Sequence, residues 1–188
     1  MTWTLYCLAR YPEYQKQCAE EVDKVLPDDT SVPTYEQVKH DFPVLERVFK
    51  EVLRLYPIVP FLVRNSDIDL EFDGHFVPRG TELSIQVLMI HRHPKYWTDP
   101  TRFWPERFLV DGIKHPYSYI PFSAGHRSCI GQIFAQLEAR TLLSILLKRF
   151  EFILDESKGP VEPEAFLTMR PKNGVHLFVR PRRSAAVQ

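Results

Sequence analysis

The sequence predicts a mainly α-helical fold with small β-sheets, and three observations lead to this prediction. Apolar residues recur every three or four positions in several long segments, which is the spacing of one buried helix face. Short stretches of alternating polarity lie between these segments and end at turn-forming residues, as the strands of a small sheet do. The chain has 188 residues, 44% of them hydrophobic, which is enough to build one sizeable core.

Helices come first along the chain. Residues 1–10 have a helical pattern without a capping residue, and Pro12 suits the first position of a second helix that ends before Pro27. A short helix is expected to begin at Thr34, and a longer one covers 45–55.

Strands are predicted in the middle of the chain. Residues 59–64 and 68–72 read as extended segments, and the second leads through Asp-Gly at 73–74, a typical two-residue hairpin turn, into 75–77. Residues 81–87 are expected to continue this small sheet.

The last part of the chain combines one long helix with further strands. The helix ends at about Arg149, and a strand follows at 150–154. Residues 167–170 and 175–179 flank a Pro-Lys-Asn-Gly turn and are therefore predicted to pair as a hairpin. Residues 184–188 are expected to be a frayed tail. No internal repeat, linker or second domain is predicted.

Charge and cysteine content exclude several classes of protein. The chain has 24 lysine and arginine residues and 24 aspartate and glutamate residues. It therefore lacks the net positive charge that would favour nucleic-acid binding. No apolar run approaches the roughly 20 residues of a membrane-spanning helix, and no signal peptide is evident. Three irregularly spaced cysteines argue against a disulfide framework and for a reducing compartment. Cys7 and Cys18 are interpreted as core residues.

The most informative motif lies in residues 119–132. Cys129 stands at or just before the start of the long helix, where free amide hydrogens carry roughly half a positive charge and favour a thiolate. Arg127 supplies a cation suited to a carboxylate, while Gly125 and Gly131 allow a tight turn and the close approach of a flat group. The alternative is a small buried cysteine, the usual role of a lone cysteine.

This motif resembles the cysteine loop of the cytochrome P-450 haem-thiolate monooxygenases, Phe-x-x-Gly-x-Arg-x-Cys-x-Gly, at all five fixed positions. The resemblance implies a haem b cofactor whose iron takes Cys129 as its axial ligand. It further implies cofactor contacts from the neighbouring residues Phe122, Gly125, Arg127, Ile130 and Gly131. The amides of residues 130–132 are expected to donate hydrogen bonds to the sulfur.

Glu51 and Arg54 form a second motif. Their spacing places them on one side of the 45–55 helix, and periodicity alone predicts a solvated ion pair opposite the apolar face. The resemblance implies instead a structural role, in which both residues join Arg107 of the Pro-Glu-Arg-Phe run at 105–108 and hold the haem side of the fold.

Residues after this helix are candidates for the substrate pocket. The resemblance implies that Val59, Phe61 and Leu62 line the pocket, that Arg64 contacts a haem propionate, and that Leu167 lies near the pocket mouth. Ordinary strand core is the alternative interpretation of the apolar residues.

Histidines suggest a different metal site. His91 and His93 are one residue apart, but zinc sites need three or four ligands at defined spacing, and Cys129 with His126 or His115 supplies no such pattern. We therefore interpret His91 and His93 as part of a polar turn after a strand, and keep a zinc-binding module as an alternative.

The resemblance also implies an activity. Residues 5–13, 54–57 and 122–125 are most similar to family 4, the fatty-acid omega-hydroxylases. Such an enzyme inserts one oxygen atom from O2 into a C–H bond of a lipophilic substrate, for which a fatty acid is the candidate, with electrons from NADPH through a reductase. Basic contacts for that reductase are expected at Lys114, Arg140 and Lys148, although a solvated face explains them equally well.

The similarity covers nearly the whole chain but only the last part of a typical family member. Residues 1–188 are therefore expected to be the carboxy-terminal haem-binding portion of a single domain. The oxygen-activating residues would precede Met1, so that no catalytic residue is expected within this chain. The membrane anchor would also lie upstream, and the resemblance implies the cytosolic face of the endoplasmic reticulum. A catalytically silent fragment is the second alternative.

Overall fold

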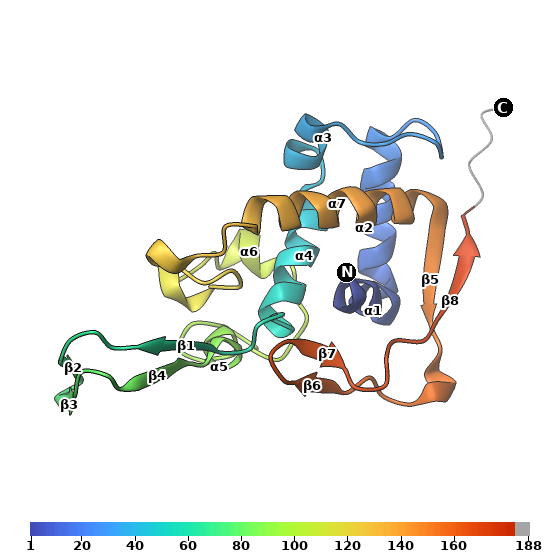
Figure 1. Cartoon of the computed structure of the whole chain (residues 1–188). Coiled ribbons are helices and arrows are strands. Elements are labelled where there is room, and N and C mark those ends of the chain that lie inside the picture. The colour runs from blue at the N-terminus through green and yellow to red at the C-terminus, as the bar shows by residue number, and fades with distance from the viewer. Residues whose placement is uncertain (183–188) are drawn as a thin grey trace.

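The computed structural model describes residues 1–182 and places most helices around one core, with two-stranded sheets at its margin (Figure 1). The α-helices are α1 (Thr2–Arg10), α2 (Pro12–Val25), α3 (Tyr35–His40), α4 (Pro43–Leu55), α5 (Val87–His91), α6 (Arg107–Val110) and α7 (Gln132–Arg149). Single 3-10 turns occupy η1 (Pro116–Ser118), η2 (Gly125–Arg127) and η3 (Glu156–Lys158). The predicted fold class, mainly α with small sheets, is confirmed.

The strands pair two by two in antiparallel fashion. They are β1 (Leu62–Asn65) with β4 (Glu82–Ile85), β2 (Leu70–Phe72) with β3 (His75–Val77), β5 (Phe150–Leu154) with β8 (Leu177–Pro181), and β6 (Pro163–Ala165) with β7 (Met169–Pro171). The β1–β4 pair and the β2–β3 hairpin extend away from the helices, whereas β5 packs beside α1 and β8 pairs with the outer edge of β5 (Figure 1).

Local chemistry explains where the first helices begin. Pro12 occupies the first turn of α2, where its missing N–H costs nothing. Thr34 and Gln37 form a reciprocal capping box at the start of α3. At α4, the Glu21 carboxylate of α2 accepts the free amides of Val44 and Leu45 at 2.7 and 3.0 Å. A side chain of one helix therefore satisfies the open end of another.

The core lies where α7 crosses α2 and α4, and α1 packs beneath it (Figure 1). Trp3 of α1 stacks on Tyr56 at a centroid distance of 4.2 Å. Buried Gln15 connects α2 to β5, because its amide donates to the Phe152 carbonyl and accepts from the Phe152 N–H. Cys7 and Cys18 are buried free thiols in this core, as predicted.

Two predictions about strands are wrong. The strand expected at 81–87 stops at Ile85, and Val87 begins α5, whose first and last residues are both buried. The hairpin between 167–170 and 175–179 does not form, since β7 pairs with β6 and β8 pairs with β5. The turn itself exists, with the Gly174 amide donating to Pro171. A turn is formed by neighbouring residues. The partner of each flanking strand, however, depends on strands that are distant in the sequence.

The predicted tail at 184–188 lies outside the described residues. Within residues 1–182, no helix has the length and apolar character needed to cross a bilayer.

Neighbouring leucines of α7 provide a test of this core. Leu143 is fully buried, whereas Leu142 is 43% exposed. We expect Leu143→Ala to lower the free energy of unfolding by about 2–5 kcal/mol, because the deleted side chain leaves a cavity. Leu142→Ala, measured by the same urea titration, should cost less than about 1 kcal/mol. Equal costs would mean that the two faces of α7 are assigned incorrectly.

Candidate functional site: a cysteine loop beside an apolar cavity

A buried carboxylate on α4 binds a second residue of that helix and the segment that contains Trp104 and Arg107. Glu51 Oε2 accepts from Arg54 Nε at 2.8 Å, and Glu51 Oε1 accepts from Arg54 Nη2 at 2.9 Å and Arg107 Nε at 3.0 Å. Glu51 Oε1 also accepts the Trp104 N–H at 2.9 Å. All three charged side chains are 0% exposed. The solvated pair that periodicity predicts is therefore wrong, because the chain from 91 to 107 covers this side of α4.

One carboxylate does not balance two guanidinium groups, and backbone carbonyls complete the site. Arg54 donates to the carbonyls of His91, Pro100 and Arg102. Arg107 donates to the carbonyls of Thr98, Asp99 and Arg102. These charge-assisted bonds fix an irregular segment that has no strand or helix partner of its own. The cluster thus holds the connection between α5 and α6.

The cysteine loop runs from Pro121 to Gly131, between the start of α7 and the Glu51 cluster. The Cys129 N–H donates to the Phe122 carbonyl at 2.8 Å and closes the loop. Gly125 has φ +72°, a conformation in which a side chain would strain the backbone. The thiol of Cys129 is exposed, so the alternative of a small buried cysteine is wrong.

Helix α7 begins three residues after Cys129. The Gln132 amide, predicted to donate to the sulfur, instead donates to the Cys129 carbonyl at 3.3 Å. Ile130 is fully exposed beside it. A Cβ added to Gly131 would meet the Cys129 Sγ atom at 3.8 Å and no other atom within 4 Å. On this side of Gly131, the sulfur is therefore the one atom of residues 1–182 within contact distance.

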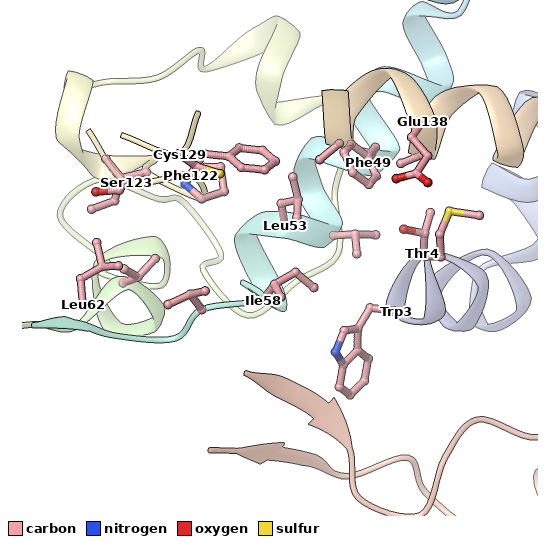
Figure 2. Close-up of a pocket in the computed structure, with 18 of the residues that line it drawn as sticks. Trp3, Thr4, Phe49, Leu53, Ile58, Leu62, Phe122, Ser123, Cys129 and Glu138 are labelled. Atoms are coloured by element: carbon pink, nitrogen blue, oxygen red, sulfur yellow. The ribbon is translucent and has the colours of Figure 1, made fainter. Parts of the chain in front are cut away.

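A cavity of about 600 Å³ lies beside this loop, and Figure 2 shows its lining side chains. Cys129, Phe122 and Ser123 stand at one side, and Trp3, Thr4 and Glu138 stand at the other (Figure 2). The wall between them is mainly apolar and comes from α4, the segment after it with the start of β1, α5, the residue before Pro121, and α7. It includes Phe49, Val52, Leu53, Ile58, Val59, Leu62, Val87, Ile120, Ala135 and Ala139.

The structure separates the predicted pocket residues into two groups. Val59, Leu62 and Arg64 line the cavity. Phe61 and Leu167 do not, and they are 37% and 82% exposed. Phe61 precedes Leu62, and alternation along an extended chain directs it to the opposite side. Leu167 lies in the turn between β6 and β7, outside the cavity wall.

Two cationic side chains line the same cavity as Cys129. Arg64 and Arg127 both line the cavity, and Arg64 Nη2 lies 3.4 Å from the Ser123 hydroxyl. Guanidinium groups bind carboxylates through paired hydrogen bonds. A thiol, two guanidinium groups and an apolar wall fit a flat, apolar, dicarboxylate cofactor such as haem, whose iron takes a thiolate ligand.

The prediction that His91 belongs to a polar turn is wrong. This residue ends α5, is 0% exposed, and its Nε2 atom accepts the Ile120 N–H at 2.8 Å. It is therefore a core residue and no part of a polar turn. The apolar run at 87–90 was the available signal, because Val87 and His91 are one helical turn apart on the same buried face. Among residues 1–182, no three His, Cys, Asp or Glu side chains are grouped as a metal site.

Two of the three cations proposed to contact a reductase are already paired. Arg140 is 8% exposed and lies 3.7 Å from the Glu46 carboxylate. Lys148 contacts Asp23 and donates to the Leu26 carbonyl. Lys114 is exposed. The first two cations therefore stabilise contacts within the fold.

Comparison with known proteins decides the family. The family model for cytochrome P450 matches residues 1–178. The chain belongs to the cytochrome P450 family.

Relatives of this P450 chain include family 4 members. It is 41% identical over 187 residues to cytochrome P450 4B1 of Rattus norvegicus, covering 98% of this chain and 36% of that protein. It is 39% identical over 186 residues to cytochrome P450 4V2 of Homo sapiens, covering 98% of this chain and 35% of that protein. The predicted resemblance to family 4 is confirmed.

A solved structure, the cytochrome P450DA heme domain, matches with a TM-score of 0.87 and 33% identity. The match covers 97% of this chain and 40% of that one. The chain thus spans about a third of the length of the curated relatives it matches.

The Glu51 cluster gives one prediction. Glu51→Gln removes the charge that opposes two buried guanidinium groups, so we expect the free energy of unfolding to fall by about 3–5 kcal/mol. Glu46→Gln is the matched control on the same helix, because Glu46 is partly exposed and pairs with Lys50 and Arg140. It should cost less than about 1 kcal/mol in the same urea titration. Similar values for both variants would contradict the role assigned to Glu51.

His91 gives a second prediction. Burial lowers its pKa from 6.5 to about 4, and the nearby Arg54 charge acts in the same direction, while the neighbouring backbone of Arg54 and Leu53 opposes the shift. The unfolded chain therefore binds the extra proton first, and stability present above pH 6.5 is lost as the pH falls toward 4. The loss should reach about 3 kcal/mol. Unfolding titrations of wild type and His91→Gln test this, because the variant should lack this component across that window.

Proposed function

We propose that residues 1–188 are the haem-binding, carboxy-terminal portion of a single haem-thiolate monooxygenase domain, with Cys129 as the axial ligand of the iron. The observation that carries this proposal is the exposed Cys129 thiol on the wall of an apolar cavity that Arg64 and Arg127 also line. When bound, haem supplies oxygen activation and the insertion of one oxygen atom into a substrate C–H bond.

Each residue of the site has a separate task in this proposal. Cys129 supplies the anionic sulfur, and Arg64 and Arg127 pair with the propionates. Phe122 packs against the ring system from the loop. Gly125 gives the loop its turn, and Gly131, with Ile130 beside it, leaves the sulfur side open for the flat group.

Glu51, Arg54 and Arg107 have a structural role in this proposal. Their side chains are fully buried and none of them lines the cavity, so they contact neither cofactor nor substrate. They hold the haem-side fold through the carbonyls between residues 91 and 102.

The substrate proposed is lipophilic, with a fatty acid as the leading candidate from the likeness to family 4. Val59 and Leu62 on the cavity wall support an apolar ligand. Electrons would come from NADPH through a reductase, and O2 is the second substrate. Placement on the cytosolic face of the endoplasmic reticulum follows from the same likeness.

Haem binding tests the central claim. The 188-residue chain is mixed with haemin, reduced under carbon monoxide and examined for the red-shifted Soret band of a thiolate-ligated complex. We expect the band in wild type and its complete loss in Cys129→Ala, because no other exposed thiol is present among residues 1–182.

Cys18→Ala is the matched control, since Cys18 is fully buried and should not affect the band. A thiolate-type band that survives Cys129→Ala would exclude Cys129 as the ligand. Absence of haem binding by a folded wild-type chain would support the alternative of a silent fragment.

A further inference from the structure

His91 contacts Tyr119 and Ile120, the two residues that lead into the cysteine loop. It ends α5, which packs against the end of α4 (Figure 1), and its ring stacks on Tyr119 at a centroid distance of 5.3 Å. Its Nε2 atom accepts the Ile120 N–H at 2.8 Å. A ring nitrogen that accepts a hydrogen bond carries no proton, so the imidazole is neutral with its proton on Nδ1. That Nδ1 is buried near the backbone of Leu53 and Arg54 but makes no hydrogen bond of normal geometry.

The backbone of His91 contacts the charged cluster. Its carbonyl oxygen accepts from Arg54 Nη1 at 2.9 Å, and Arg54 is held by Glu51. One residue therefore joins two sites, with its main chain fixed by the Glu51 cluster and its side chain bonded to the segment that enters the loop. No atom of His91 lines the large cavity.

Ile120 is the point at which the loop must be fixed. Proline follows it, and Pro121 has no N–H to donate. The Ile120 carbonyl accepts the Ser123 N–H at 3.0 Å, and the Phe122 carbonyl accepts the Cys129 N–H at 2.8 Å. Ser123 has φ +66°, a conformation that persists only where its surroundings hold it. A shift of Ile120 would therefore be transmitted through two hydrogen bonds to Cys129.

We propose that His91 is a positioning residue for the cysteine loop, whose neutral imidazole anchors Ile120 and so sets the place of the Cys129 thiol relative to the Glu51 cluster. The inference deepens the proposed function, on which its haem readout rests, while its main readout needs no haem. Burial disfavours the charged imidazolium and keeps the imidazole uncharged at neutral pH. A second ring proton on Nε2 would also displace the Ile120 N–H.

Hydrogen exchange of the chain without haem is the direct test. His91→Phe preserves an aromatic ring against Tyr119 but removes the acceptor, so protection of the Ile120 amide should fall by a factor on the order of ten. Amides of α2, such as that of Val22, should keep their protection relative to the global stability of each variant. His75→Gln is the control, because His75 is exposed on β3 and should leave Ile120 unchanged.

Two further variants distinguish the effect of losing the hydrogen bond to Ile120 from the effect of losing the aromatic ring. Glutamine places an acceptor near the position of Nε2, and asparagine near that of Nδ1. We expect His91→Gln to retain Ile120 protection within about threefold and His91→Asn to lose it as His91→Phe does. This comparison decides the proposal even if His91→Phe does not fold. Unchanged Ile120 protection in His91→Phe or His91→Asn, or a loss shared equally by α2, would overturn it.

The haem-loaded chain supplies a second readout. His91→Asn should bind haem with wild-type stoichiometry but show less of the thiolate-type carbon monoxide band, and His91→Gln should restore that band. A wild-type chain without this band would contradict the proposed function, whereas Ile120 exchange would still decide the role of His91. Equal band intensity in all three proteins would contradict the positioning role.

Discussion

A single buried carboxylate, Glu51, controls the geometry of this chain. Removing an ion from water costs several kcal/mol, and that cost is offset only where opposite charges and hydrogen bonds surround the ion completely. Arg54 and Arg107 do so here, and their remaining N–H groups bond the carbonyls of the segment between α5 and α6. The order of an otherwise irregular connection follows from electrostatics, since apolar packing alone would leave these carbonyls unsatisfied.

The position of the cysteine loop depends on the Glu51 cluster. Arg54 holds the His91 carbonyl, His91 holds Ile120, and the loop closes through the hydrogen bond from Cys129 to Phe122. The loop in turn forms one wall of a cavity whose other walls come from α1, α4 and α7. An exposed thiol beside two guanidinium groups and an apolar surface suits a group with one metal, two carboxylates and a flat hydrocarbon body. In this chain, buried charges therefore fix the segment that leads to the exposed Cys129 thiol.

Much of the fold was predictable because its signals are local. Prolines marked the start of α2, the Asp-Gly pair marked the β2–β3 hairpin, and the Thr34 capping box marked α3. The pairing of β7 and β8 was not predictable, because each pairs with a strand that the turn at 173–174 does not specify. His91 was assigned to a polar turn because histidine is a polar residue. The apolar residues just before it already indicated a helix with a buried face, and His91 belongs to that face.

The sequence alone determined the family, the cysteine that the site presents and the helices that support it, since five loop positions and helical periodicity are properties of neighbouring residues. Only the tertiary structure decided that Glu51 and Arg54 are buried, that Val59 and Leu62 face the cavity while Phe61 and Leu167 do not, and that His91 reaches Ile120. The physical reason is that burial depends on which distant segment covers a side chain. Periodicity identifies the faces of a helix, but it carries no information about what packs on the polar one.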